Sequence, residues 1–296
     1  MHLLAVLVQL VLYACSSSVV LCRIIPSFHF LLQYGKALSD NTSPSPLLLR
    51  PFTATVPKTW FTHFYIFGAL CSAYALIILG LAHSNIYTTP VNYLLTLDHY
   101  LSRRLGRFST NDFNLLYSQA QLSLAIITIQ CARRWYECLY VEKMSNKARI
   151  RLGHYLVGHL FYLAVSCAIL CDSLQNSINP SPNALSLSSC SVAFVLYLTA
   201  ARAQYSAHKQ LASLKKYSPP PPTFLFKYLV CPHYTAEIVV YISIAVICDF
   251  SSATVAVIIW TIVNLGASAE QSRAFYVDKF GEKVVDGKYN IIPFVF

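Results

Sequence analysis

Long apolar runs alternate with short polar connections along most of the 296-residue chain. A helix needs about 20 apolar residues to cross the hydrocarbon core of a bilayer, and several of these runs approach that length. The pattern therefore predicts an all-α, polytopic membrane protein with about seven transmembrane helices. The helices are expected at Leu3–Cys22, Trp60–Ala82, a segment beginning near Leu115, Leu152–Cys171, Ser191–Tyr205, Ala236–Cys248 and Ser252–Ser268.

Composition places the chain among membrane proteins. Hydrophobic residues make up 56% of it and charged residues 11%, whereas soluble domains carry about 25% charged residues. The net charge of +10 does not indicate nucleic-acid binding, because the Lys and Arg residues lie in short clusters between apolar segments. We therefore expect the membrane bilayer, and no nucleic acid, as a partner of this protein.

The positions of the basic clusters predict an orientation. Connections at 133–151 and 202–227 are basic, whereas 172–190 contains no Lys or Arg. Because Lys and Arg are enriched in cytosolic loops, we expect the basic connections and the C-terminus in the cytosol. The basic cluster 103–107 does not fit this rule. Asn41, in the only glycosylation sequon of the chain, is then cytosolic and is expected to carry no glycan.

The first apolar run is expected to remain as a span rather than to be removed as a signal peptide. No basic region precedes it, and apolar residues continue past the position where cleavage would occur. The proline-rich stretch 39–57 is an irregular connection, because apolar segments resume directly after it. We divide the chain into residues 1–58, the first transmembrane helix with a proline-rich cytosolic loop, and residues 59–296, a helical membrane domain.

The ten cysteines do not form a recognisable metal site. The chain has no CxxC pair and no Cys/His spacing typical of zinc. Most of the cysteines lie inside apolar runs, where they behave as small apolar residues. We therefore expect no metal. Cys171 and Cys190 flank one expected lumenal loop, and a disulfide between them stays open.

The segment Cys231–Ile238 places an imidazole, a phenol and a carboxylate at the mouth of the sixth expected span. An ionisable residue at a membrane segment is costly to desolvate unless a function or a partner uses it. The apolar residues that follow Glu237 indicate that its carboxylate is partly buried. We therefore take Glu237, His233 and Tyr234 as candidate catalytic residues.

Further polar residues come from four connections to the same, cytosolic membrane face. Arg and Lys side chains bind phosphates, and aromatic side chains can cover a flat ring, so this set suits a phosphate-bearing cofactor. No glycine-rich dinucleotide loop is present, which excludes a Rossmann site. Two structural readings stay open: attraction of the arginines to anionic lipid, and an ion pair between them and Glu137. The candidate binding residues are Arg133, Arg134, Gln204, His208, Lys215, Arg273 and Tyr276.

Several stretches resemble the steroid 5α-reductase family. They are Arg134–Val141, Leu211–Lys215, Cys231–Ile238, Phe275–Glu282 and Ile292–Phe296. Within the family, Val56–Tyr65 and Glu137–Val141 resemble the polyprenol (polyprenal) reductase branch rather than the steroid-reducing one. The resemblance covers most of the chain from Val56 onward, and its most specific part is the ending combined with the His-Tyr-x-x-Glu motif.

The resemblance implies a seven-span reductase of the endoplasmic-reticulum membrane, with residues 59–296 as a reductase-type helical bundle. It implies that NADPH is the cofactor. It also implies that the enzyme saturates the α-isoprene double bond of a polyprenyl lipid, on the route to dolichol for protein N-glycosylation. Glu237 matches the family glutamate beside the nicotinamide. The positions that match cofactor-contacting residues of the family are His233, Arg134, Gln204, Lys215 and Tyr276.

Hydride addition to a C=C bond needs a conjugated carbonyl to take up the developing negative charge. This requirement favours the aldehyde, polyprenal, as the substrate. The residues themselves leave aldehyde and alcohol open.

Two positions depart from the family pattern. Arg273 stands where the family usually has a histidine, and Pro221–Phe226 lacks the usual glycines. A guanidinium group, which is always protonated, cannot exchange a proton as imidazole does, but it can hold a phosphate.

Three other functions stay open at this point. The first is a trans-2-enoyl-CoA reductase of fatty-acid elongation, whose substrate carries a soluble CoA head. The second is a membrane methyltransferase that uses S-adenosylmethionine. The third is a non-catalytic, lipid-binding relative of the reductases. Oxidation of NADPH by the purified protein with each candidate substrate distinguishes them.

Overall fold

Seven α-helices make up most of the described part of this computed structural model, which comprises residues 3–28, 32, 54–84, 86, 110–144, 148–178, 187–214 and 218–294. The helices are α1 (Leu3–Ile24), α4 (Phe61–His83), α6 (Thr110–Tyr140), α7 (Leu152–Ile178), α8 (Leu187–Ser213), α9 (Pro232–Ile247) and α10 (Ser252–Phe280). Short 3₁₀ helices lie at Pro26–Phe28, Lys58–Trp60, Phe224–Lys227 and Glu282–Val284. The helical fold expected from the apolar runs is confirmed.

Two three-residue strands, β1 (Thr55–Pro57) and β2 (Arg149–Arg151), add a small sheet that the sequence did not predict. They pair antiparallel, with Val56 opposite Ile150. Strands this short show no alternating pattern of apolar and polar residues. They join the segment before α4 to the segment before α7.

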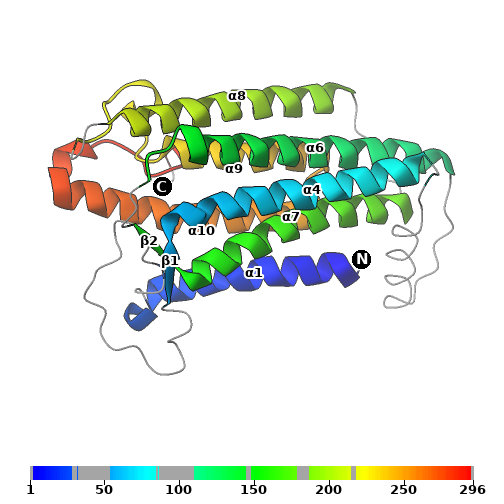
Figure 1. The fold of residues 1–296 in the computed structure, drawn as a ribbon, viewed down its shortest axis with the longest axis horizontal. Coiled ribbons are helices and arrows are strands. Elements are labelled where there is room, and N and C mark those ends of the chain that lie inside the picture. The colour runs from blue at the N-terminus through cyan, green and yellow to red at the C-terminus, as the bar shows by residue number, and fades with distance from the viewer. Residues whose placement is uncertain are drawn as a thin grey trace.

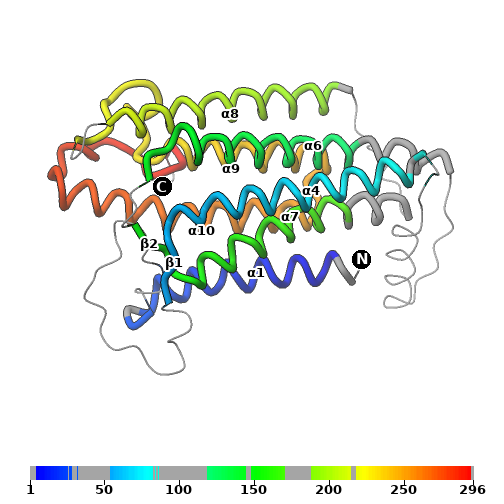
Figure 2. The backbone as a smooth tube through the Cα atoms, in the orientation of Figure 1, coloured from blue at the N-terminus to red at the C-terminus, as the bar shows by residue number. Residues whose placement is uncertain are grey.

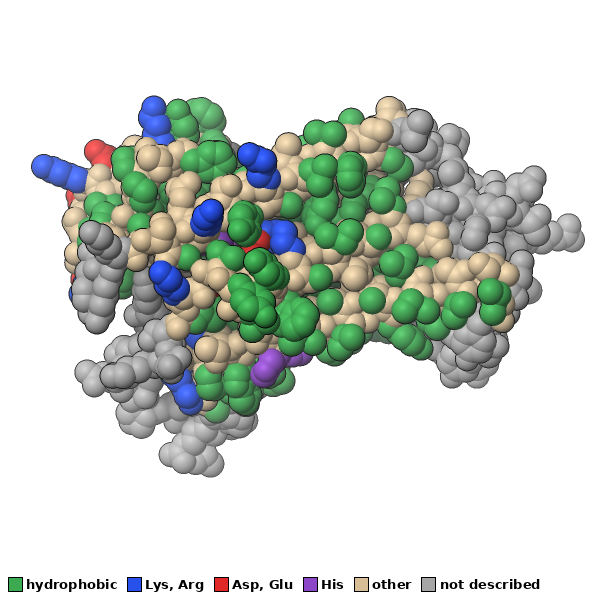
Figure 3. All heavy atoms as spheres, turned by 45° about the horizontal axis from the view of Figure 1, so that its top comes forward, with side chains coloured by type: hydrophobic (Ala, Val, Ile, Leu, Met, Phe, Trp, Pro, Cys, Tyr) green, Lys and Arg blue, Asp and Glu red, His purple; other side chains and the backbone are tan. Residues whose placement is uncertain are grey.

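Successive helices run in opposite directions, and the path of the chain can be followed in Figure 2. The helices α1, α6, α8 and α10 finish at the end of the bundle where α4, α7 and α9 begin (Figure 1). Figure 3 shows Lys and Arg side chains toward this end of the face in view, and mostly hydrophobic side chains over its middle. We call it the basic end.

Four segments within the described residues are long and apolar enough to cross a membrane: Ala5–Ile24, Lys58–Ala82, Leu152–Leu170 and Ser252–Phe280. The helix α9 is apolar but only 16 residues long. The helices α6 and α8 are longer and more polar, because each includes basic residues before its C-terminal end. The structure thus supports a helical membrane protein with four candidate spanning helices, fewer than the expected seven.

Several helices extend beyond their predicted bounds, among them α7, which continues to Ile178 rather than Cys171. The helix α8 continues to Ser213 rather than Tyr205, α9 begins at Pro232 rather than Ala236, and α10 continues to Phe280 rather than Ser268. The helix α10 continues through polar residues and stops at Gly281, whose φ of 82° is outside the helical region. Several predicted site residues therefore lie on helices rather than in loops.

Some sequence predictions concern residues outside the described part of the chain. These include the basic cluster 103–107 and Asn41. Cys190 is a free cysteine, and the side chain of Cys171, its possible disulfide partner, also lies outside the described part. The division at residue 58 stays a prediction, although α1 packs into the same apolar core as the later helices and Arg23 pairs with Glu270 of α10.

The C-terminal segment after α10 folds back onto the beginning of α9. The backbone N–H of Val230 donates to the carbonyl oxygen of Tyr289 at 2.8 Å. Within α9, Thr235 Oγ1 donates to the carbonyl oxygen of Ile291 at 2.6 Å. These bonds fix the start of the helix that carries His233 and Glu237.

Arg273 holds the same C-terminal segment from α10. Its guanidinium donates to the carbonyl oxygens of Lys288 at 2.8 Å and Val285 at 3.2 Å, and lies 3.5 Å from Asn290 Oδ1. The planar fork of donors suits several acceptors at once. Arg273 therefore connects α10 to the segment that fixes the start of α9.

Replacing Arg273 by Lys should destabilise this contact, because an ammonium group cannot reproduce the fork of the guanidinium. We expect a loss of about 1–3 kcal/mol in the free energy of unfolding, measured as a lower midpoint of thermal unfolding in detergent. Arg202→Lys is the matched control, since Arg202 is exposed on α8. Equal midpoints for the two variants would contradict the proposed importance of the contact.

Candidate functional site

A fully buried carboxylate organises the region where the basic ends of α6 and α8 meet. Glu137 is 0% exposed and accepts hydrogen bonds from Arg133 Nη1 and Arg134 Nη1, which precede it by four and three residues. Burial of an unpaired carboxylate costs several kcal/mol, and the two guanidinium groups offset this cost. The ion pair that the sequence left open for Glu137 is therefore formed.

Arg134 connects three helices. Its Nη2 donates to Tyr65 Oη of α4 at 3.2 Å and pairs with Glu142 at 2.8 Å. The guanidinium also lies 5.0 Å from the centre of the Tyr65 ring, within the range of a cation–π contact. Its Nη1 lies 2.8 Å from His208 Nδ1 of α8. Protein groups thus engage most of the donors of Arg134.

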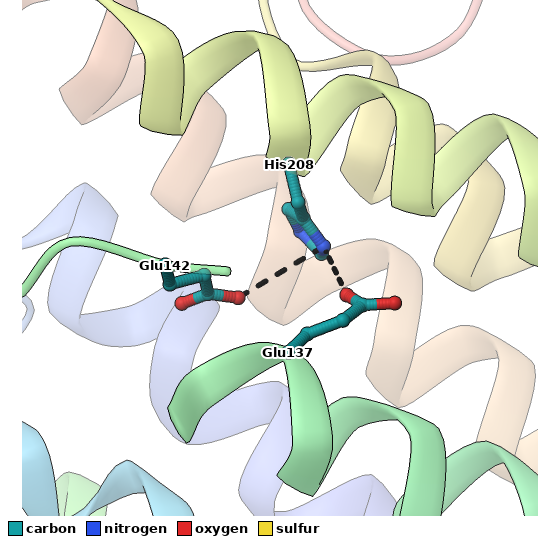
Figure 4. Close-up of side chains that lie close together, drawn as sticks. All are labelled: Glu137, Glu142 and His208. Atoms are coloured by element: carbon teal, nitrogen blue, oxygen red, sulfur yellow. Dashed lines mark hydrogen bonds and ion pairs between the residues drawn. The ribbon is translucent and has the colours of Figure 1, made fainter. Parts of the chain in front are cut away.

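His208 lies between two acidic side chains, as Figure 4 shows. Its Nδ1 is 2.6 Å from Glu137 Oε2 and 3.9 Å from Glu142 Oε1. His208 follows the apolar part of α8, and burial together with the positive charge of Arg134 holds the pKa of its imidazole well below the ordinary value. The ring is therefore neutral at physiological pH.

The same three side chains have a spacing that could hold a metal ion. One ligand atom from each of Glu137, Glu142 and His208 lies within 4.8 Å of the others. Both carboxylate oxygens of Glu137, however, already accept hydrogen bonds from guanidinium groups. Two positive charges at this distance oppose a further cation. The arrangement is better described as an ion-pair network.

Buried amides connect this network to Glu237 on α9. Arg133 Nη2 donates to Oε1 of both Gln130 and Gln204. The Nε2 groups of both glutamines donate to Glu237 Oε2, that of Gln130 at 3.0 Å. Glu237 Oε1 accepts no hydrogen bond from the residues that the structure describes, and the side chain is partly accessible. One oxygen of Glu237 is thus held, and the other is available to a ligand.

Gln130 was not among the residues that the sequence singled out. It lies inside an apolar run and is 0% exposed. A neutral amide does not stand out in such a run as a charged residue does. One indication of its role was present in the sequence: Gln130 precedes Glu137 by seven residues, or two helical turns, so the two residues share one face of α6.

His233 precedes Glu237 by one turn of α9. Its carbonyl oxygen lies 3.4 Å from Gln204 Nε2, and its ring centre lies 5.3 Å from that of His208. His233 Nδ1 is buried and has no hydrogen-bond partner in the described part of the chain. Leaving a buried polar atom unpaired costs about 1–3 kcal/mol, which a ligand bound at this position would offset.

Six of the predicted residues are therefore brought together: Arg133, Arg134, Gln204, His208, His233 and Glu237. Tyr234 and Tyr276 pack instead against a second apolar cluster beside the C-terminal segment, which includes Val230 and Ile291. Arg273 is bonded to that segment. Lys215 lies outside the described residues.

Comparison with known proteins places this arrangement in a family. Residues 151–296 match the sequence family described as 3-oxo-5-alpha-steroid 4-dehydrogenase. The chain is 31% identical to the polyprenal reductase of Saccharomyces cerevisiae over 266 residues, covering 89% of this chain and 85% of that protein. It is 28% identical to the polyprenal reductases of Drosophila melanogaster, covering 89% and 82%, and of Homo sapiens, covering 86% and 81%.

The similarity extends over nearly the whole of both chains, so it includes α6, α8 and α9 and the residues that converge on Glu237. It confirms the resemblance that the His-Tyr-x-x-Glu motif and the C-terminal segment suggested. The chain belongs to the steroid 5α-reductase family, in its polyprenal reductase branch.

Proposed function

We propose that this protein is an NADPH-dependent polyprenal reductase, which saturates the α-isoprene double bond of its substrate in dolichol synthesis and so supports protein N-glycosylation. The relatives named polyprenal reductase support the lipid substrate. The observation that carries the proposal is the state of Glu237. Two glutamines fix one of its oxygens, and the other faces no donor from the described residues.

The residues present fit a nicotinamide cofactor. Glu237 Oε1 offers an acceptor for the carboxamide N–H of the ring, and His233 offers an unpaired ring nitrogen one turn away. Arg133, whose side chain is 20% exposed against 8% for Arg134, is the better placed of the two for a phosphate. From the resemblance we retain Lys215 and Tyr276 as expected cofactor contacts, and Arg273 supports the C-terminal segment.

NADPH supplies a hydride, and the protein supplies orientation and charge. Gln130 and Gln204 prevent rotation of the Glu237 carboxylate, so Oε1 keeps one direction. A carboxylate beside the nicotinamide also stabilises the positive charge that the ring gains as the hydride leaves. Glu237 therefore has a positioning role toward the cofactor and an electrostatic role in the reaction.

We further propose that all seven helices cross the endoplasmic-reticulum membrane with the basic end in the cytosol. The alternating directions of the helices support this (Figure 1), as does the enrichment of cytosolic loops in Lys and Arg. In the cell, α6, α8 and α9 would be shielded from lipid in part by their neighbours. Asn41 is cytosolic in this arrangement, so a glycan on Asn41, detected by endoglycosidase H, would overturn it.

The substrate is tested by NADPH oxidation with purified protein in detergent or in lipid nanodiscs. The panel is polyprenal, polyprenol, a trans-2-enoyl-CoA and a 3-keto-4-ene steroid, each analysed by mass spectrometry for a gain of two hydrogens. We expect turnover with polyprenal. Turnover with the enoyl-CoA alone would assign the protein to fatty-acid elongation. Protection against unfolding by S-adenosylmethionine and not by NADPH would indicate a methyltransferase.

Replacing Glu237 by Gln should weaken NADPH binding about 10- to 100-fold, the equivalent of one charge-assisted hydrogen bond of about 1.5–3 kcal/mol. The introduced amide can turn its oxygen toward Gln130 and Gln204. It then presents an NH₂ group where the carboxamide of the cofactor also has a donor, so two donors face each other. Equilibrium binding of NADPH, followed by its fluorescence, measures the change.

Glu270→Gln is the matched control, because Glu270 pairs with Arg23 on α1 and both side chains are partly exposed. Surface ion pairs contribute little, so this variant should keep normal NADPH affinity and turnover. Unchanged affinity and activity in Glu237→Gln would show that the cofactor site has been assigned to the wrong residues.

A further inference from the structure

Tyr241 of α9 carries a buried hydroxyl group that has no hydrogen-bond partner among the described residues. The side chain is 2% exposed. An unsatisfied hydroxyl group in an apolar interior is destabilising, and a phenylalanine of the same shape would avoid it. Packing therefore explains the aromatic ring of Tyr241 but not its oxygen atom.

Aromatic contacts hold the ring in place. Phe161 of α7 meets it edge to face, with ring centres 5.4 Å apart and planes at 75°, and both belong to the main apolar core. Tyr162, next to Phe161, is near enough for its side chain to interact with that of Tyr241, but the Tyr241 hydroxyl makes no hydrogen bond of good geometry with any described group. Within the described part of the chain, the hydroxyl is therefore a donor on a fixed ring without a well-aligned acceptor.

The position of Tyr241 along α9 relates it to the site already described. His233, Glu237 and Tyr241 are spaced by four residues, so they follow one another along one face of the helix. Among the described residues, His233 Nδ1 and Tyr241 Oη have no hydrogen-bond partner, and no donor reaches Glu237 Oε1. One ligand site along this face accounts for all three atoms.

The direction of α9 indicates which end of this ligand site receives the cofactor and which end receives the lipid. The helix begins at the basic end and runs into the body of the bundle (Figure 1), where Tyr241 belongs to the apolar core. Four residues advance about 6 Å along a helix. Glu237 is therefore nearer to the end from which a charged cofactor binds. Tyr241 lies one turn deeper, among apolar side chains that suit an isoprenoid chain.

We propose that Tyr241 is a catalytic residue that donates a hydrogen bond to the carbonyl oxygen of the α,β-unsaturated aldehyde. This inference rests on the proposed function and deepens it, because it names the residue that meets the aldehyde oxygen. An allylic alcohol has no conjugated oxygen that can take up negative charge when a hydride adds to the double bond.

The bond changes are those of a conjugate addition. The hydride from NADPH, with its electron pair, forms a C–H bond at the β-carbon, and NADP⁺ is left. The electron pair of the C=C bond moves between the α-carbon and the carbonyl carbon, and the carbonyl π pair moves onto oxygen. The Tyr241 hydroxyl stabilises the charge there. A proton from water then adds to the α-carbon, and the product is the saturated aldehyde.

Tyr241→Phe removes only the hydroxyl group and tests this role. Because one donor to the developing oxyanion is lost, kcat with polyprenal should fall about 100-fold. The Kd for NADPH should stay within twofold of wild type. The midpoint of thermal unfolding should be unchanged or higher, since an unsatisfied polar group has been removed. A loss of kcat with these two values preserved supports catalysis by Tyr241.

Tyr155→Phe is the matched control, because Tyr155 is a tyrosine of α7 whose hydroxyl contacts His63 rather than Tyr241 and the change is the same. It should keep normal kcat. Wild-type kcat in Tyr241→Phe, equal losses in the two variants, or a parallel loss of NADPH binding would each overturn the inference while the reductase assignment stands. If the wild-type protein itself does not reduce polyprenal, the proposed function fails, and the inference fails with it.

Discussion

The buried pairing of Glu137 with Arg133 and Arg134 is the interaction on which the site depends. In the interior of a helical bundle, a carboxylate without a counter-charge would take up a proton or draw in water. The two guanidinium groups bond both oxygens of Glu137, and Arg133 extends the constraint through two glutamine amides to Glu237. A charge on α6 thus sets the orientation of a side chain on α9.

Neutral amides between the two carboxylates also keep like charges apart. Buried ion pairs seldom add much net stability compared with apolar packing, so the value of this network lies in geometry. Glu137 has both oxygens bonded, whereas Glu237 has one bonded and one available. A functional group held by a complete supporting network is more accurately placed than one on a free rotamer.

Apolar runs alone predicted where the helices of the described part lie, because helices in a bilayer need long stretches without polar interruption. The alternation of direction then brought the residues at every second connection to one end, which is why Gln204, His208 and Glu237 were expected together. Gln130 was not predicted, because its partners depend on the rotation of α6 against α8 and α9. The apolar pattern does not specify that rotation.

Arg273 illustrates a second limit of prediction from the sequence. The path of the C-terminal segment depends on contacts with distant parts of the chain, which a local sequence pattern does not specify. The structure engages Arg273 with carbonyl oxygens of that segment, and the segment fixes the beginning of α9. This helix has only 16 residues, and it is constrained at its start and along its inner face by distant parts of the chain. It therefore holds His233, Glu237 and Tyr241 in fixed order, although each has a polar atom without a partner in the described part of the chain. Such a site is organised before its ligands bind, so less ordering is required on binding.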